Sequence, residues 1–547
     1  MKKILVYCSL FVIILFHSLV AQSINDSTFS KVNIPRDSKQ TIYGRITDSN
    51  GKPIIAQVQV WYFPLTEVVF AFGSEPTKGR TDNLIGITYS SNNGYYAIKV
   101  PADTMTLIIT KGPEWDLFKE KIIVNNNEFD GIEKNISLKH LYDLKKLGWY
   151  GGDTHHHSLH SDGRQTPSQI ASAMKGVGLS WGFLSDHNST AGNIEWRDNS
   201  SFDFIAIPAN EISTEPAHIS DANGFGHMNQ SFINNLNGSY PLLKNIWSRA
   251  VFKSHYDVQK MIEETKKQNG FISINHPFQS WDWSGRFKSW GFINNFDAIE
   301  VWNGDPPHSL TTSSWDKNKI NINTWAVHAW FSYLNAGNRL SGIAGSDCHD
   351  IFGTHSYPKG EYYWTTTTGN ARTYVHTKKL NSDAIKKSLK EGRIFLTSGF
   401  GPILLVEADK KYPGEILKVP SNGIVNVEIK VLANQQLLMS NDAVRIIVNG
   451  LVVQNLSTDS SLTYNKSHSI VIEKDSWIVV QAFGQWPMYA ITNPIYLDYP
   501  PYGDYPKKEF VNPLGTQAWN NFLNHPEITV PDGPTSWKNS YDVFNKK

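Results

Sequence analysis

The feature that most constrains this chain is a series of histidines and acidic residues that follow apolar, strand-like runs. The first group is His155 and His157, and the last is Asp347 and His349. In a strand, side chains at positions i and i+2 point to the same face, so each pair can hold one ion. A lone His-x-His is weak support for a metal site, and the residues between the two pairs make it stronger.

Several further apolar runs between these pairs lead into side chains that are able to bind metal. These side chains are Asp186 and His187, Asn210 and Glu211, Asn275 and His276, and Glu300 with Asn303. The carboxyl ends of parallel barrel strands converge on one mouth, where barrel enzymes keep their chemistry. We therefore expect a metal centre at such a mouth. Histidine and carboxylate ligands without a thiolate cluster suit zinc, manganese or iron, and the sequence does not choose between them.

A centre of this kind indicates hydrolysis. Clustered ions lower the pKa of bound water towards about 7 and clamp the attacking and leaving oxygens of a displacement. The formal net charge of +1 gives no electrostatic reason to expect a nucleic acid partner or an anionic membrane surface. The expected partner is a small or polymer-derived ester substrate. The oligomeric state is not predicted.

The N-terminus resembles a secretory signal peptide. Lys2 and Lys3 precede an apolar run from residue 4 to residue 20, and cleavage is expected near Ala21. An uncleaved anchor is the alternative, but the run is short for a membrane span and no later segment has the character of one. We expect export to a periplasm or to the exterior. Only Cys348 remains after cleavage, so no disulfide within the chain is expected.

Composition and pattern divide the rest of the chain into five parts. A chain of 547 residues is expected to form two to four domains. Short alternating strands with turn signals predict a β-sandwich, and strands alternating with helices predict βα units. The expected parts are a linker over residues 22–40, a β-sandwich over 41–140, a βα region over 145–402, a second β-rich region over 403–500 and a tail over 501–547. The sandwich loosely resembles the carboxypeptidase regulatory-like domain.

The motifs of the βα region, taken in order, resemble those of the PHP (polymerase and histidinol phosphatase) superfamily. The matching segments are Gly148 to Ser158 with Ser161-Asp162-Gly163, Ser185-Asp186-His187, Ala209-Asn210-Glu211-Ile212, Ile274-Asn275-His276-Pro277 and Gly345-Ser346-Asp347-Cys348-His349. Four other segments are similar to the CehA/McbA-like branch: Gly226-His227-Met228-Asn229, Ile299 to Gly304, Gly392 to Thr397 and Ile491 to Tyr496. The resemblance covers about residues 145–500.

That resemblance implies a distorted (β/α)7 barrel that holds two or three divalent ions. The implied ligands are His155, His157, Asp162, His187, Glu211, His227, His276, Asp347 and His349. One implied division gives the first ion His155, His157 and Asp347, the second His227 and His276, and the third Asp162, His187 and His349. Glu211 would bridge two ions, and a metal-bridging hydroxide would be the nucleophile. His218 is a rival to His227, which is favoured by its Gly-His-Met-Asn context.

Residues next to the ligands have other expected roles. Asp153 and Asp186 point away from the ligand face of a strand, which favours supporting roles over direct ligation. His156 and Cys348 alternate with the expected ligands along the chain, so their side chains are also expected to point away from the ligand face. Glu300 and Asn303 are candidate substrate contacts at a strand end, with structural roles equally open. Arg372 is a candidate anion-binding residue because a guanidinium forks onto carboxylate or phosphate, and a surface salt bridge is the alternative.

Three functions are compatible with this sequence. The first is an exported metal-dependent hydrolase that cleaves a phosphomonoester or phosphodiester, with His155, His157, Glu211, Asp347 and His349 at its catalytic centre. The second is the same centre acting on a carboxyl ester or carbamate, as the branch name implies. The third is a non-catalytic protein that binds a ligand at the cell surface. The third predicts a damaged ligand set, whereas every motif position here holds a competent ligand.

Overall fold

The structure is a computed structural model. It describes residues 40–63, 84–126, 131–214, 224–233, 252, 254–278, 287–304, 306–307, 322–352, 355–356, 362–363, 367–434, 443–458, 462–484, 488–503 and 505–517. The expected signal peptide and nearly all of the expected linker lie outside these residues. In the described part of the chain, no helix is both long and apolar enough to cross a membrane.

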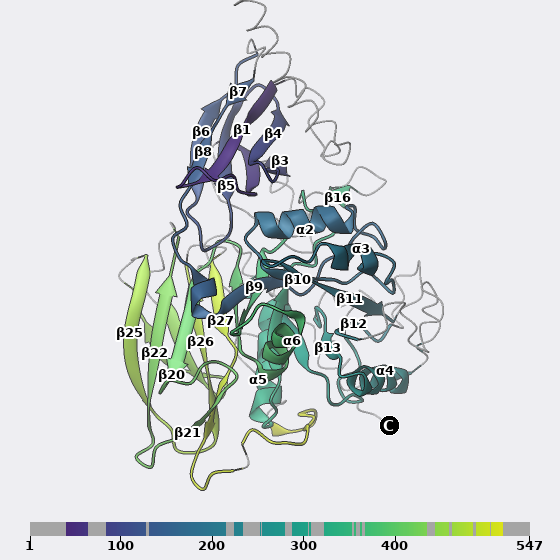
Figure 1. Cartoon of the computed structure of the whole chain (residues 1–547). Helices are drawn as coiled ribbons and strands as arrows, with labels where there is room; N and C mark the ends of the chain where they lie inside the picture. Colours follow the sequence, from purple (N-terminus) through teal and green to yellow (C-terminus); the bar gives the residue numbers. More distant parts are fainter. Residues whose placement is uncertain are drawn as a thin grey trace, which may run out of the picture.

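The N-terminal region is a β-sandwich (Figure 1). Its strands are β1 (Gln40–Asp48), β2 (Gln57–Tyr62), β3 (Leu84–Tyr89), β4 (Tyr95–Val100), β5 (Thr104–Thr110), β6 (Phe118–Ile123), β7 (Ile132–Glu133) and β8 (Ile136–Leu138). One sheet has the order β4-β1-β7, with β8 also paired to β1, and the other has the order β3-β2-β5-β6. The side chains of Ile42, Val58 and Leu107 are fully buried in the apolar core of this region.

The central region alternates strands with helices. Its elements are η2 (Leu144–Leu147), β9 (Trp149–Asp153), α2 (Pro167–Gly176), β10 (Trp181–Leu184), α3 (Asn193–Asp198), β11 (Ile205–Ser213), β12 (His227–Ser231), α4 (His255–Lys267), β13 (Phe271–Ile274), β14 (Ala298–Asn303), α5 (Ile322–Asn335), β15 (Ser341–Gly345), β16 (His355–Ser356), β17 (Tyr362–Tyr363), β18 (Ala371–His376), α6 (Ser382–Glu391) and β19 (Ile394–Ser398). Local signals set the helix ends. The Thr166 side chain accepts from the backbone N–H of Gln169 at the start of α2, and Gly392 adopts a left-handed conformation after α6.

In the part of the C-terminal region that the structure describes, nine strands follow. They are β20 (Ile403–Ala408), β21 (Ile416–Lys418), β22 (Ile424–Leu432), β23 (Val444–Val448), β24 (Leu451–Leu456), β25 (Thr463–Val471), β26 (Ser476–Phe483), β27 (Tyr489–Thr492) and β28 (Ile495–Asp498). Strands β20, β22 and β25 form a sheet of their own. Strand β27 instead pairs with β19, and β26 and β23 follow it in the same sheet. The sheet of the central region therefore continues into β27, β26, β23 and β24, whereas β20, β22 and β25 are not part of it.

The described strands do not establish the expected distorted (β/α)7 barrel. They build one mixed sheet with the order β15-β14-β13-β12-β11-β10-β9-β18-β19-β27-β26-β23-β24. Strands β9, β10 and β11 are parallel, as are β13, β14 and β15, but β12 is antiparallel to both of its neighbours. Strand β18 is also antiparallel to β9. The regular βα alternation is broken at these two strands, and β19 carries the sheet onward to β27.

The sheet curls strongly at the carboxyl ends of its parallel strands. Just beyond β9 and β15, the Asp347 N–H donates to the His155 carbonyl at 2.9 Å, and the His157 N–H donates to the Cys348 carbonyl at 3.0 Å. These two bonds join segments that stand far apart in the strand order. The loops that follow β9, β10, β13 and β15 are thereby gathered around one centre.

Candidate metal centre

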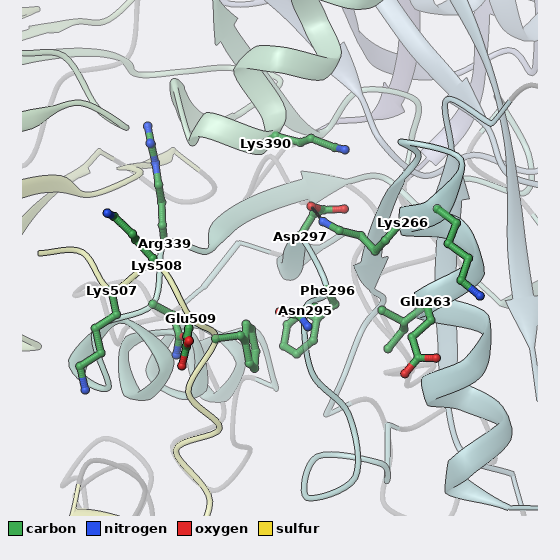
Figure 2. Close-up of a pocket in the computed structure, with 14 residues that line it drawn as sticks. Glu263, Lys266, Asn295, Phe296, Asp297, Arg339, Lys390, Lys507, Lys508 and Glu509 are labelled. Carbon is green, nitrogen blue, oxygen red and sulfur yellow. Dashed lines mark hydrogen bonds and ion pairs between the residues drawn. The ribbon is translucent and has the colours of Figure 1, made fainter. Parts of the chain in front are cut away.

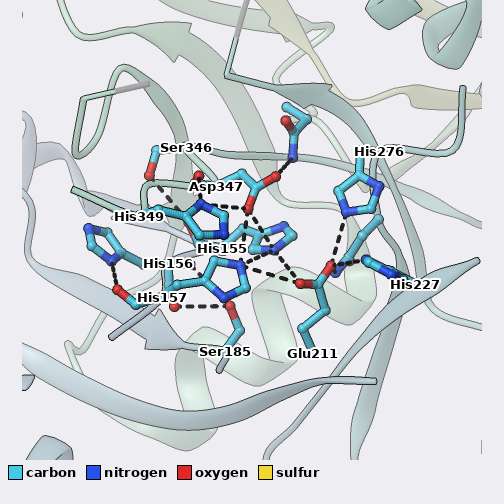
Figure 3. A network of polar contacts seen from close by, with 12 residues as sticks. His155, His156, His157, Ser185, Glu211, His227, His276, Ser346, Asp347 and His349 are labelled. Carbon is cyan, nitrogen blue, oxygen red and sulfur yellow. Dashed lines mark hydrogen bonds and ion pairs between the residues drawn. The ribbon is translucent and has the colours of Figure 1, made fainter. Parts of the chain in front are cut away.

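All nine expected ligands lie together at this gathered edge. Figure 3 shows His155, His157, Glu211, His227, His276, Asp347 and His349 among them. His155 and His157 follow β9, His187 follows β10, His276 follows β13, and Asp347 and His349 follow β15. Asp162 lies on the loop that leads into α2, and Glu211 lies within β11. The rival residue His218 lies outside the described residues.

The antiparallel strand β12 explains how His227 reaches the same edge. His227 is the first residue of β12, whereas most of the other ligands follow the last residue of a strand. In the antiparallel pair, His227 stands opposite Ser213, the last residue of β11. A strand that runs in the opposite direction presents its beginning where its neighbours present their ends. The departure from a parallel barrel therefore brings His227 to the centre.

Glu211 is the central carboxylate of the cluster. Its Oε1 lies 3.2 Å from Nδ1 of His227 and 3.0 Å from Nε2 of His276. Its Oε2 lies 3.3 Å from Nε2 of both His155 and His157, and 3.0 Å from Nδ1 of His187. Each oxygen faces a different set of imidazoles, which is the arrangement expected of a carboxylate that bridges ions.

Among the described residues, four overlapping groups of ligand atoms are each close enough to hold an ion. The groups are His157 with Asp162, His187 and His349; His155 with His157 and Asp347; His155 with Glu211 and His276; and His187 with Glu211 and His227. The division implied by the resemblance differs from this, first because it leaves His157 out of the group of Asp162, His187 and His349. It also pairs His227 with His276, whereas in the structure these two histidines belong to separate groups that share Glu211.

The ligand atoms would be better satisfied by divalent ions than by hydrogen bonds to one another. The Nε2 atoms of His155 and His157 are 3.1 Å apart, and Oε2 of Glu211 lies near three ring nitrogens without a hydrogen bond of acceptable geometry. A buried carboxylate oxygen without such a partner is costly, and an ion among these atoms would satisfy it. Histidine and carboxylate are the ligand types that zinc, manganese and iron accept.

The electrostatics of the cluster lower the pKa values of its carboxylates Glu211 and Asp347 and raise those of His155, His157 and His349. Burial opposes ionisation, but the surrounding histidines outweigh it and hold the pKa values of Glu211 and Asp347 well below their usual range. Burial also lowers the pKa of His157, yet Asp347 and Glu211 raise it to about 10. The pKa of His155 is likewise held well above its usual value. Metal ions binding here would displace the protons that the raised pKa values favour.

Asp153 and Asp186 support the ligands, as their phase on the strands predicts. Asp186 accepts from the backbone N–H and the hydroxyl of Ser158, both at 2.7 Å, and from the Ser161 hydroxyl at 2.9 Å, which fixes the loop that carries Asp162. Asp153 accepts from the backbone and the hydroxyl of Ser346 at 2.9 and 2.6 Å, which ties β9 to the Asp347 loop. Burial raises the pKa of Asp153 to about 6.

Glu300 acts behind the ligands rather than on a substrate, which corrects one of its expected roles. It is buried, and its Oε1 lies 3.0 Å from Nδ1 of His155, while its Oε2 accepts from the His276 backbone N–H at 2.8 Å. A carboxylate at the second ring nitrogen fixes the tautomer and the orientation of a ligating histidine. Asn303 is less buried, and its amide donates to Glu300 at 3.0 Å and to Asp347 at 3.2 Å.

Arg372 does not serve as an anion-binding residue, which corrects a second expectation. Its side chain is 1% exposed. Its Nε donates to the Gly369 carbonyl at 2.8 Å, and its NH1 donates to the Val177 carbonyl at 3.1 Å. The guanidinium therefore holds the turn before β18 against the end of α2, and it offers no free fork to a substrate.

Asn275 and Ser213 are further partners of the ligands. The sequence pattern indicates Asn275 only as a side chain able to bind metal, and it does not single out Ser213. The Asn275 amide donates to Oε1 of Glu211 at 2.9 Å, and the Ser213 hydroxyl lies 2.6 Å from Nδ1 of His187. Asn275 directly precedes His276 in its motif, and Ser213 stands two places after Glu211 on the same strand. Since residues at i and i+2 of a strand share a face, this spacing was the signal for Ser213.

A separate cavity of about 640 Å³ lies at the opposite end of the same strands (Figure 2). Asp297 directly precedes β14 and Arg339 lies just before β15, whereas the metal ligands follow these strands. Several of the charges here are engaged with the protein itself. Lys266 pairs with Asp297, and Arg339 donates to the carbonyls of Glu391 and Gly414. This cavity connects α4 to the segment around Phe510 and holds none of the predicted ligands.

Comparison with known proteins gives similarity to solved structures alone. No family model matches the chain, and no curated protein matches it in sequence. A two-domain protein of Bacteroides vulgatus, described as containing a PHP-like metal-dependent phosphoesterase, is 16% identical with a TM-score of 0.32, over 61% of this chain and 90% of the other. A protein of Bifidobacterium adolescentis described as a metal-dependent phosphoesterase is 15% identical with a TM-score of 0.27, over 44% and 95%.

The lesion-specific endonuclease EndoQ of Pyrococcus furiosus is also similar. It is 14% identical with a TM-score of 0.26, over 44% of this chain and 56% of the other. Because these TM-scores and identities are low, the function proposed below rests on the geometry of the cluster.

Proposed function

We propose that this chain is a PHP-type metal-dependent hydrolase that cleaves a phosphoester. The observation that carries the proposal is the convergence of six histidines and three carboxylates from distant segments into overlapping ion-sized groups. When bound, divalent ions supply Lewis acidity, a lowered pKa for water and compensation of charge on phosphate oxygens. The chain's own residues hold and orient that centre. Glu211 links the groups, Glu300 orients His155, and Asn275 orients Glu211.

The charges around the ligands also support a multi-metal centre. Among the described residues, the cationic partners of Asp162, Glu211 and Asp347 are histidines, and no lysine or arginine pairs with these three carboxylates. Such a concentration of buried negative charge requires positive counter-charge. The same feature keeps the carboxyl ester or carbamate hydrolase as a second candidate, because a phosphatase commonly adds a cationic side chain for its anionic substrate. A non-catalytic binding role is disfavoured by the complete ligand set.

An assay with three chromogenic substrates tests this proposal. The purified full chain, loaded with Mn²⁺ or Zn²⁺, is expected to hydrolyse an aryl phosphate or an aryl phosphodiester, and to lose that activity when the metal is removed. Hydrolysis of an aryl ester alone would select the second candidate. A chain that binds its metals in stoichiometric amounts and cleaves none of the three would contradict both hydrolase proposals.

Export belongs to the same proposal. The basic residues Lys2 and Lys3, the apolar run that follows them and the small residue Ala21 support removal of a signal peptide and release into a periplasm or the exterior. Mass spectrometry of the protein recovered from its native compartment is expected to give a mature N-terminus near residue 22. An intact N-terminal run on the recovered protein would contradict this part.

A further inference from the structure

A chain of buried hydrogen bonds runs from the N-terminal β-sandwich to the loop that carries two of the expected ligands. The Trp61 indole N–H donates to Oε1 of Gln59 at 3.0 Å, and the Gln59 amide donates to Oε1 of Gln57 at 2.7 Å. The Gln57 amide donates to the Tyr89 hydroxyl at 2.9 Å, and that hydroxyl donates to the Ile351 carbonyl at 3.0 Å. Every donor points the same way, so each bond polarises the next.

The alternation of side chains on β2 shows why this chain faces the central region. Val58 and Val60 lie in the core of the sandwich, while Gln57, Gln59 and Trp61 point to the other face and are buried as well. Trp61 packs in a cluster that includes Trp149 and Phe395 of the central region. A strand that is buried on both faces belongs to two packed layers at once, so the sandwich is docked against the central region and is not a free appendage.

Tyr89 makes the contact with the ligand-bearing loop. Its side chain is 7% exposed and packs with Ile351, Phe352 and Met174 in one apolar cluster. Ile351 lies two residues after His349. Its carbonyl accepts from Tyr89, and its backbone N–H donates to Oε1 of Gln165 at 3.1 Å. The two peptide groups that flank Ile351 are therefore held between the sandwich and the loop that carries Asp162.

One of the four ion-sized groups takes more of its ligands from exposed loops than the group around Glu211 does. The group of His157, Asp162, His187 and His349 takes Asp162 and His349 from loops, and the Asp162 side chain is 52% exposed. The group of His155, Glu211 and His276 is fully buried and includes a carboxylate from within strand β11. Loops hold side chains less rigidly than strands do, and a ligand in a loop depends on the contacts around it.

We propose that Tyr89 is a positioning residue for the ion held by Asp162, His187 and His349, so that the N-terminal β-sandwich is a structural part of the metal centre. The inference rests on the proposed function insofar as the cluster must bind metal. The sandwich then has a structural role within the catalytic unit.

The test is metal titration of full-length Tyr89→Phe, which removes only the hydroxyl. Zn²⁺ or Mn²⁺ is added to the metal-free protein, and bound ion is counted by elemental analysis at each free concentration. One ion of the set is expected to bind about 10-fold more weakly, the range seen when a supporting partner of a ligand is removed, while the others keep their affinity. Unchanged affinity for every ion would overturn the proposal.

A matched control separates positioning from general stability. Tyr96→Phe removes a hydroxyl that donates to the Lys134 carbonyl at 2.9 Å within the same sandwich. It is expected to leave all metal affinities unchanged, whatever it does to the melting temperature. Gln57→Met keeps Tyr89 but removes its donor, and it should weaken the same ion to a smaller degree. This second variant decides the matter if Tyr89→Phe does not fold. Wild-type protein that binds no metal would instead refute the proposed function.

Discussion

Replacing Glu211 with glutamine is expected to lower kcat/KM for the substrate that the wild-type chain hydrolyses by at least about 10³-fold, because the loss of one preorganised polar group in a catalytic site already costs about 10²–10³-fold. The loss is expected to be larger for Glu211, because it contacts several ligands at once. Its two oxygens lie within 3.3 Å of ring nitrogens from five histidines. The metal content should fall together with the activity, and both are measured on the same preparation.

Glutamine cannot adopt an orientation that suits this position. If its NH2 group replaces Oε1, it meets the Asn275 amide, which donates to that oxygen at 2.9 Å, so two donors face each other. If the NH2 group replaces Oε2, it faces the ring nitrogens of His155, His157 and His187, where a metal ion would need an acceptor. Either rotamer removes one ligand oxygen and the negative charge.

Two matched Glu→Gln variants make the result specific. Glu300→Gln changes a carboxylate that touches His155 from behind, and a loss of about 10–100-fold is expected for such a supporting partner. Glu120→Gln breaks an exposed ion pair with Lys134 in the sandwich and should leave the activity unchanged. If Glu211→Gln retained near-normal activity with full metal content, Glu211 would not be the bridging ligand.

The ligand set is predictable from the sequence because its signal is local. Each ligand follows an apolar run or lies within a recurring motif, and the parallel strands carry these separate signals to one edge. The supporting roles of Asp153 and Asp186 follow from the two-residue period of a strand in the same way. The grouping around Glu211 does not follow, since it depends on how far the sheet curls between β9 and β15.

Other features leave little trace in the sequence. Strand β12 consists of His227, Met228, Asn229, Gln230 and Ser231, which are all buried. Because most of these residues are polar, the sequence gives no sign that they form a central strand. Helix α5 is buried on almost every side, and it therefore lacks the polar face that marks a helix by period. The pairing of β27 with β19 joins segments far apart in the chain, and no local pattern specifies such a partner.

Arg372 and Tyr89 illustrate the same limit at the level of single residues. An arginine at the start of a strand looks the same in sequence whether its guanidinium binds an anion or two buried carbonyls. Only the packing of α2 against the turn at Gly369 distinguishes the two cases. Tyr89 lies in a different sheet from every ligand, and its contact with Ile351 spans more of the chain than any motif does.

Removal of the metal ions by a chelator is expected to abolish hydrolysis completely, and added Mn²⁺ or Zn²⁺ should restore it more readily at high pH than at low pH. The direction follows from His155 and His157, whose pKa values are raised in the metal-free cluster, that of His157 to about 10. At pH 7 the His157 ring therefore holds a proton that the ions must displace, and the raised pKa of His155 acts in the same direction. Each proton released makes the apparent affinity rise about tenfold per pH unit below that pKa.

The stability of the metal-free chain should respond to pH in the opposite direction. A histidine whose pKa is raised on folding stabilises the folded state fully below its unfolded value of about 6.5, and that contribution is lost as the pH rises through about 10. The melting temperature of the chelated protein is therefore expected to fall between pH 7 and pH 10, while its affinity for metal rises over the same interval. Calorimetry of the chelated protein and metal titration across this range measure both trends. A melting temperature that rises with pH would mean that the histidines are not paired with Glu211 and Asp347, and the charge distribution assigned to the centre would be wrong.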